Sequence, residues 1–214
     1  MKDLILIGAG GLGRELLQWI KDCNAKNPVW NIKGFIDDNI NQLTNIKCSH
    51  AIIGTLQDWI PTPNEVFVCA IANPLIKEKI VKQLKLKGAN FTNVIHPTSI
   101  IGSENNIGEG LILYPFARIT VNCTVGDFVT IQSSAIGHDA SVDDFSTISS
   151  NCIITGNTSV GKRVFIGTSS TIIPNITIAD DVYIGAGSVV MRNISSGLKV
   201  MGNPARAFTP PNNN

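Results

Sequence analysis

A six-residue period of aliphatic side chains runs through the C-terminal half of this sequence. From Ile107 every sixth residue to Ile131 is Ile, Leu or Val, and the series resumes at Ile136 and continues to Val190. The period matches neither the 3.6-residue repeat of a helix nor the two-residue alternation of one amphipathic strand. It is typical of a solenoid of short strands, in which each aliphatic side chain points into a common core and each coil stacks on the next.

Two further features accompany this repeat. Glycine often follows the aliphatic residue, as at Gly126 and Gly137, and we expect these glycines to adopt the positive φ that a tight corner needs. One residue is missing from the period between Ile131 and Ile136, and His138 comes shortly after the break. Because a regular solenoid needs no such break, we interpret it as a functional hint, with His138 facing outward near a corner.

A different pattern occupies the N-terminal part of the chain. The apolar run 4–7 leads into Gly8, Gly10 and Gly13, a spacing that brings backbone N–H groups close to an anion at the start of a helix. Alternating strands and helices predict a small parallel sheet. The expected strands are 4–7, 33–36, 51–54, 65–71 and 91–95, and the expected helices are 12–21 and 74–87.

Composition narrows the function classes. Charged residues make up 15% of the chain and the formal net charge is +1, so no charge excess indicates nucleic acid or an anionic membrane as a partner. The five cysteines show no Cys-x-x-Cys spacing, which favours reduced thiols over disulfides or zinc. No signal peptide or membrane-spanning run is evident. We therefore expect a cytoplasmic protein without a metal.

Taken together, the hexapeptide period, the Gly8–Gly13 loop and the C-terminal Gly202-Asn203-Pro204-Ala205-Arg206 resemble the sialic acid O-acetyltransferase and bacillosamine N-acetyltransferase family of sugar acetyltransferases. The resemblance spans roughly residues 2–208. It implies an α/β plus β fold: a Rossmann-like nucleotide-sugar-binding domain over 1–97, a left-handed parallel β-helix acetyltransferase domain over 98–208, and a disordered tail over 209–214.

The resemblance also implies a reaction. Acetyl would pass directly from acetyl-CoA to the amino group of a UDP- or GDP-linked amino-deoxysugar. His138 corresponds to the family's general base, a task that suits imidazole because it titrates near neutral pH. Asp139 would orient that imidazole, and the Gly156 N–H would stabilise the thioester oxygen. The family forms homotrimers with active sites between subunits.

Further binding residues follow from the same resemblance. Thr147 stands where relatives often carry a second His, and Leu12 stands where they often carry a polar residue. The implied acetyl-CoA contacts are Thr147, Gly156, Thr168, Ala186 and Arg206. The implied nucleotide-sugar contacts are Gly10, Gly11, Leu12, Asp37, Asp38 and Ala72.

Three alternatives stay open at this point. The same fold could O-acetylate sialic acid or another sugar hydroxyl. The chain could instead be a non-catalytic module that binds a nucleotide sugar. A nicotinamide oxidoreductase is the third, although the N-terminal domain is too short for two full mononucleotide-binding halves. The sequence identifies neither the nucleotide nor the sugar.

Overall fold

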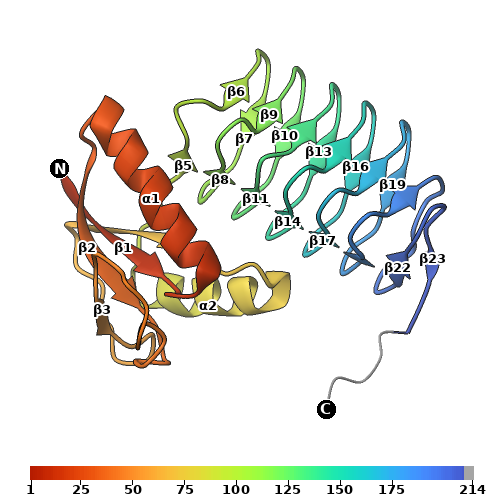
Figure 1. Cartoon of the computed structure of the whole chain (residues 1–214). Helices are drawn as coiled ribbons and strands as arrows, with labels where there is room; N and C mark the ends of the chain where they lie inside the picture. The colour runs from red at the N-terminus through yellow and green to blue at the C-terminus, as the bar shows by residue number, and fades with distance from the viewer. Residues whose placement is uncertain (210–214) are drawn as a thin grey trace. The chain divides into compact units, whose positions relative to one another are not determined.

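The structure is a computed structural model that describes residues 1–209. The chain divides into two compact units, Met1–Pro97 and a second unit that begins at Thr98 (Figure 1). The predicted disordered tail lies, from Pro210 onward, outside the described residues.

The first unit is built on a parallel sheet. Leu4 to Ile7 in its central strand are completely buried, as the uninterrupted apolar run predicted. The sheet has the order β3-β2-β1-β4, so the direction of strand succession reverses beside β1. Such a reversal is where α/β sheets bind ligands, outside the carboxyl ends of the strands. Its elements are β1 (Lys2–Ile7), α1 (Gly11–Lys26), β2 (Trp30–Ile36), β3 (Ile52–Gly54), β4 (Glu65–Cys69) and α2 (Pro74–Leu86).

Several element boundaries in this unit differ from the sequence prediction, most clearly at α1 and at the strand predicted at 91–95. Helix α1 continues five residues beyond Lys21, with its apolar stripe extended to the buried Cys23. The strand predicted at 91–95 is only Val94–Ile95 (β5), and it does not belong to the four-stranded sheet. Phe91 forms one isolated β-bridge with Phe67 of the edge strand β4. The segment before Val94 is therefore a loop that touches the sheet edge at this one point.

The second unit is a three-sided parallel β-solenoid (Figure 1). Each short strand has an inward-pointing second residue and an outward-pointing first residue. The first face contains β8 (Ile112–Leu113), β11 (Thr130–Ile131), β14 (Thr147–Ile148), β17 (Phe165–Ile166), β20 (Tyr183–Ile184), β22 (Lys199–Met201) and the antiparallel β23 (Arg206–Ala207). The second contains β6 (Ile100–Ile101), β9 (Arg118–Ile119), β12 (Ala135–Ile136), β15 (Ile153–Ile154), β18 (Thr171–Ile172) and β21 (Val189–Val190). The third contains β7 (Asn106–Ile107), β10 (Thr124–Val125), β13 (Ser141–Val142), β16 (Ser159–Val160) and β19 (Thr177–Ile178).

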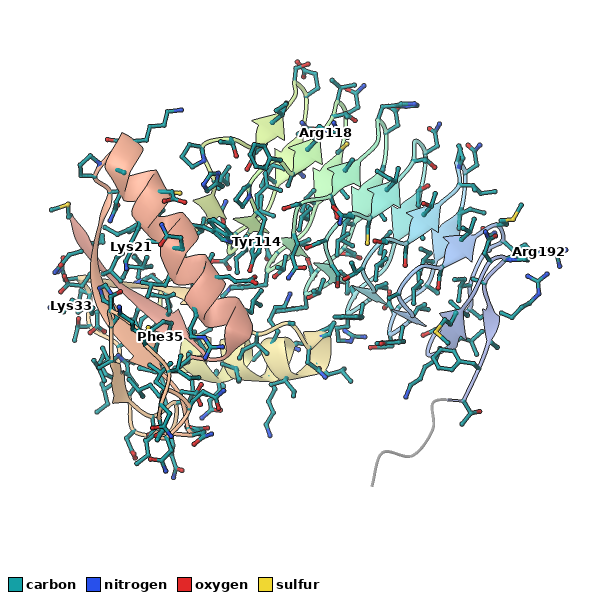
Figure 2. All side chains as sticks on the ribbon, viewed as in Figure 1. Lys21, Lys33, Phe35, Tyr114, Arg118 and Arg192 are labelled. Atoms are coloured by element: carbon teal, nitrogen blue, oxygen red, sulfur yellow. The ribbon has the colours of Figure 1, made fainter. Side chains whose placement is uncertain are left out.

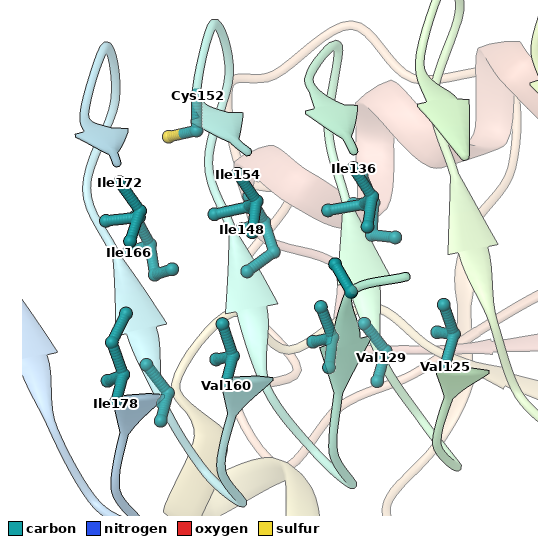
Figure 3. Close-up of a cluster of buried hydrophobic side chains, with 14 of the residues drawn as sticks. Val125, Val129, Ile136, Ile148, Cys152, Ile154, Val160, Ile166, Ile172 and Ile178 are labelled. Atoms are coloured by element: carbon teal, nitrogen blue, oxygen red, sulfur yellow. The ribbon is translucent and has the colours of Figure 1, made fainter. Parts of the chain in front are cut away.

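The core of the solenoid consists of the periodic aliphatic residues. Ile136, Ile154 and Ile172 lie directly above one another in the second face and are fully buried (Figure 3). The break in the period is absorbed in the corner between β11 and β12. There the side-chain oxygen of Gln132 accepts hydrogen bonds from the N–H and hydroxyl of Ser150, both at 3.0 Å. The strand register therefore continues unchanged across the break.

The expectation of positive φ at the corner glycines was wrong. Gly126 and Gly137 are not among the residues with positive φ; in their corners that conformation falls later, at Phe128 and Asp139. Asn and Asp tolerate it better than most residues. The glycines are needed for close stacking instead: a Cβ at Gly137 would lie 2.8 Å from the backbone N of Gly156 in the next coil.

Candidate active site

His138 and Asp139 occupy the corner between the second and third faces, directly after β12. The Nδ1 atom of His138 lies 2.7 Å from Oδ2 of Asp139, and the two side chains are 61% and 47% exposed. Adjacent side chains normally diverge, but Asp139 has a φ of 57°, and this left-handed conformation supplies the bend that brings them together. An imidazole whose Nδ1–H donates to a carboxylate keeps Nε2 available as a proton acceptor.

Gly156 lies at the same corner one coil later. The Asn157 N–H donates to the His138 carbonyl at 3.0 Å, which ties the two coils together at this point. A Cβ at Gly156 would lie 2.5 Å from Cε1 and 2.6 Å from Nε2 of His138. The imidazole therefore packs against the Cα of Gly156, and the residues predicted as base and thioester-oxygen donor are neighbours.

Three backbone N–H groups at two corners of the solenoid have no acceptor within the described residues. At the corner between the third and first faces, equivalent N–H groups are capped by aspartates; the Lys162 N–H, for example, donates to Asp180 Oδ1 at 2.9 Å. Within residues 1–209, the N–H groups of Gly156, Thr168 and Ala186 make no hydrogen bond. Because polypeptide N–H groups are almost always satisfied, these three are suited to carbonyl or amide oxygens of a ligand.

The residues predicted to bind acetyl-CoA do not form one cluster in a single chain. Gly156 shares the corner of His138, whereas Thr168 and Ala186 lie at the corner between the first and second faces, after β17 and β20. Thr147 points outward from β14 on the first face and is buried. Arg206 lies in β23 and is exposed.

The glycine loop of the first unit leaves the start of α1 open to a ligand. Gly10 is the N-cap residue and provides no side-chain cap, and the first turn contains no acidic residue. A Cβ at Gly11 would meet no atom within 4 Å, so the backbone there is approachable. Gly13 has a different role, because a Cβ there would lie 2.0 Å from the carbonyl oxygen of Gly8. The helix can therefore pack on β1 only with Gly at position 13.

Asp37 and Asp38 follow β2 directly, at the same edge of the sheet, and each already accepts a backbone hydrogen bond. Asp37 accepts the Ala9 N–H at 2.8 Å, and Asp38 accepts the Leu56 N–H at 2.9 Å. A carboxylate has further lone pairs, so neither contact prevents a hydrogen bond to a ligand. Ala72, between β4 and α2, and Leu12, in the first turn of α1, are half-buried.

Two cations near this edge were not predicted from the sequence. The Nη1 atom of Arg14 is buried and has no hydrogen-bond partner within residues 1–209. Arg14 lies at the start of α1, whose first helical residue is Gly11. Burial lowers the pKa of Lys77, in the first turns of α2, to about 7. A cation near a helix N-terminus is unfavourable because of the helix dipole. The two cations at helix starts could therefore have been recognised from the sequence as candidate site residues.

Comparisons with known proteins agree with both units. Residues 3–84 match the PglD N-terminal domain, and residues 157–192 match the bacterial transferase hexapeptide family. The chain is 30% identical to GDP-perosamine N-acetyltransferase of Escherichia coli O157:H7 over 94% of each sequence. It is 28% identical to UDP-N-acetylbacillosamine N-acetyltransferase of Bacillus subtilis (strain 168) over 53% of this chain and 51% of that protein.

A solved structure extends the likeness to the whole fold. The acetyltransferase domain of PglB from Neisseria gonorrhoeae FA1090, in complex with acetyl coenzyme A, superposes with a TM-score of 0.86 and 26% identity over 97% of this chain and 99% of that one. The predicted left-handed parallel β-helix is thereby confirmed, and fold and site define a hexapeptide-repeat acetyltransferase. The chain belongs to the sialic acid O-acetyltransferase and bacillosamine N-acetyltransferase family of sugar acetyltransferases.

No helix within residues 1–209 is both long and apolar enough to cross a membrane. The same residues contain no group of three or more His, Cys, Asp or Glu side chains that could hold a metal ion.

Proposed function

We propose that this protein transfers acetyl from acetyl-CoA to the amino group of a nucleotide-linked amino-deoxysugar. The observation that carries the proposal is the packing of the His138 imidazole against Gly156, whose N–H has no acceptor within residues 1–209. The 30% identity to a GDP-perosamine N-acetyltransferase over nearly the whole chain supports a GDP-linked 4-amino-4,6-dideoxysugar as the first acceptor to test, with the UDP-linked sugar second.

The geometry supports a direct transfer. The Nε2 atom of His138 accepts a proton from the amine as its nitrogen attacks the thioester carbonyl carbon. Asp139, bonded to Nδ1 at 2.7 Å, holds the tautomer and stabilises the imidazolium. The Gly156 N–H donates to the thioester oxygen as negative charge develops there. When the carbon–sulfur bond breaks, His138 returns the proton to sulfur, leaving an amide and the free thiol of CoA.

The first unit would hold the nucleotide. An open helix N-terminus with free N–H groups and a partial positive charge suits a diphosphate. Gly10, Gly11 and Leu12 offer that backbone. Arg14, at the start of the same helix, adds a full charge, and its buried Nη1 has no partner in the described part of the chain. Asp37, Asp38 and Ala72 line the same sheet edge, where the base or ribose would lie.

A homotrimer would complete the donor site. The N–H groups of Thr168 and Ala186, which have no acceptor among the residues described, lie at the corner between the first and second faces, whereas His138 and Gly156 lie at the corner between the second and third faces. Three-fold packing would set the Thr168 and Ala186 corner of one subunit beside the His138 and Gly156 corner of its neighbour. The outward Ile153 on the second face is exposed, which supports its burial in an assembly.

The test is thiol release from acetyl-CoA with a panel of GDP- and UDP-linked amino-deoxysugars. Removing a general base should cost about 10²–10⁴ in kcat. We therefore expect turnover on one amine, and its loss in His138→Asn with CoA binding unchanged. His50→Asn is the matched control. Turnover on sialic acid alone would move the assignment to O-acetylation. A His138→Asn variant as active as the wild type would refute the mechanism.

A further inference from the structure

Val121 is an exposed aliphatic residue one coil before His138, at the same corner of the solenoid. It follows β9, whose first residue, Arg118, is labelled in Figure 2. The Asp139 N–H donates to the Val121 carbonyl at 3.1 Å, and this hydrogen bond joins the two coils at the corner. Val121 and the proposed base are therefore neighbours along the solenoid.

The corner column that contains the base has one branched aliphatic side chain. Strand pairing aligns Ile101, Ile119, Ile136, Ile154, Ile172 and Val190 in successive coils. The residues two positions after these are Ser103, Val121, His138, Gly156, Pro174 and Arg192. Val121 is 39% exposed. Because ligand sites are lined mainly by apolar side chains, an accessible valine beside the proposed base is a candidate substrate contact.

The side chains of Val121 and His138 pack toward opposite neighbouring coils. Cγ1 of Val121 lies 3.1 Å from the position that a Cβ would take at Gly102, in the preceding coil. Cε1 of His138 lies 2.5 Å from the corresponding position at Gly156, in the following coil. Stacked strands are about 4.8 Å apart, a spacing close to the width of a sugar ring. A sugar that reacts at His138 therefore lies within reach of Val121.

The chemistry of the acceptor places a methyl group next to the reacting amine. In a 4-amino-4,6-dideoxyhexose the amine is on C4 and the C6 methyl group is on C5, the adjacent ring carbon. The coil after His138 is assigned to the thioester through Gly156, which leaves the preceding coil for the sugar. We propose that Val121 contacts this methyl group and makes the enzyme selective for 6-deoxy amino sugars, an inference that rests on the proposed N-acetyltransferase function.

Selection at this contact acts through desolvation. A 6-hydroxyl group placed against Val121 loses hydrogen bonds to water and finds no partner on the valine side chain. Apolar surfaces of this kind reject an added hydroxyl group by about 10²-fold at most. Sialic acid is disfavoured in the same way, because its glycerol side chain carries several hydroxyl groups.

The experiment compares kcat/KM for two acceptors that differ by one hydroxyl group. These are a 4-amino-4,6-dideoxyhexose and the matching 4-amino-4-deoxyhexose, both linked to the nucleotide that the enzyme uses. We expect the wild type to prefer the 6-deoxy acceptor by about 10–100-fold. Val121→Thr exchanges a methyl group for a hydroxyl group of similar size, so this preference should fall to about a tenth of the wild-type value. The KM for acetyl-CoA should stay within about twofold.

A second variant and a matched control accompany Val121→Thr. Val121→Ala removes the contact without adding a hydroxyl group, and it should reduce the same preference through a lower kcat/KM for the 6-deoxy acceptor. Val29→Thr is the control, because Val29 is 40% exposed and belongs to the first unit. It should keep the wild-type preference.

The ratio between the two acceptors separates recognition of the methyl group from damage to the fold. An equal loss on both acceptors in Val121→Thr would mean that the residue is only structural, and it would overturn the proposal. A wild type that does not distinguish the two acceptors would overturn it too, with the acetyltransferase assignment intact. A folded wild type that acetylates neither amine would instead refute the proposed function.

Discussion

The imidazole of His138 lies against a bare Cα: a Cβ at Gly156 would be 2.5 Å from its Cε1 atom. The two residues belong to neighbouring coils joined by the hydrogen bond from the Asn157 N–H to the His138 carbonyl. The missing side chain serves two purposes. It gives the imidazole its resting position, and in the proposed mechanism it leaves the Gly156 N–H open to the thioester oxygen.

Gly156→Ala should therefore impair catalysis without unfolding the solenoid. The φ of Gly156 is not positive, so alanine fits the backbone, but its methyl group displaces the exposed imidazole. We expect kcat to fall at least about tenfold, since a misplaced catalytic group can cost about 10²-fold. Steady-state kinetics and thermal unfolding check this. Ser159→Ala, on the third face, is the control. Wild-type kcat in Gly156→Ala would contradict the packing described here.

Asp139→Asn tests the partner of the base with little structural change. Asn122, Asn157 and Asn175 occupy the same corner position in other coils with the same left-handed φ, so asparagine fits the backbone there. We expect unfolding free energy within about 0.5 kcal/mol of the wild type, as for ordinary surface substitutions. We expect kcat to fall by about 10–100-fold, because the amide can favour the wrong imidazole tautomer. Asn157→Asp is the reciprocal control, and an unchanged kcat in Asp139→Asn would exclude the orienting role.

The sequence predicted most of the scaffold because its signals are local. The six-residue period identified the inward residues, and Asn73 with Pro74 marked the start of α2, where the Asn73 side chain accepts two backbone N–H bonds. The period does not reveal which corner residue adopts positive φ. The sequence analysis therefore gave the wrong reason for the presence of glycine at position 137. Tertiary contacts decide that point, as they decide the burial of Arg14.

The placement of the predicted acetyl-CoA contacts at two different corners could have been worked out by counting residues in the sequence. Positions eighteen apart share a corner, which groups His138 with Gly156 and Thr168 with Ala186. Thr168 comes twelve residues after Gly156, which is not a whole coil of eighteen, so the two groups lie at different corners. The resemblance alone supplied their roles but not this arrangement.

This division makes the shared site testable by complementation. His138→Asn and Ala186→Trp should each inactivate a trimer whose sites combine the two edges from neighbouring subunits. Mixed trimers then contain one intact site each, and random mixing restores about a quarter of wild-type activity. The measurement is thiol release after the two variants are unfolded and refolded together. Light scattering should give three times the chain mass. No recovery in a confirmed mixed trimer would mean that each site lies within one chain.

Gly13 and Gly11 should respond differently to alanine. In Gly13→Ala the methyl group meets the Gly8 carbonyl oxygen at 2.0 Å, so α1 must move off β1 at a cost of about 1–3 kcal/mol or more. In Gly11→Ala the methyl group meets no atom within 4 Å, so stability should be unchanged. We expect Gly11→Ala to raise KM for the nucleotide sugar by about tenfold by crowding the α1 N-terminus. Unchanged KM would remove the loop from the substrate site.

Lys77 predicts how the stability of the first unit depends on pH. Burial lowers its folded-state pKa to about 7, although nearby Cys69 opposes that shift. Burial also raises the pKa of Cys69 to about 12, so the thiol is neutral at pH 7 and supplies no full charge. An unfolded lysine keeps its proton to about pH 10.4. Between about pH 7 and 10 the unfolded state thus binds more protons, and the free energy of unfolding rises with pH.

Lys77→Met should remove this dependence. The variant should be more stable than the wild type below pH 7, where the buried charge costs most, and its advantage should shrink as pH rises toward 10. Urea unfolding at pH 6.5 and 9 measures it through the helical circular dichroism signal, which reports the first unit because α1 and α2 both lie there. Lys79→Met, exposed on the same helix, is the control and should show no pH-dependent difference. A constant difference between Lys77→Met and the wild type across this range would mean that Lys77 stays protonated in the folded protein.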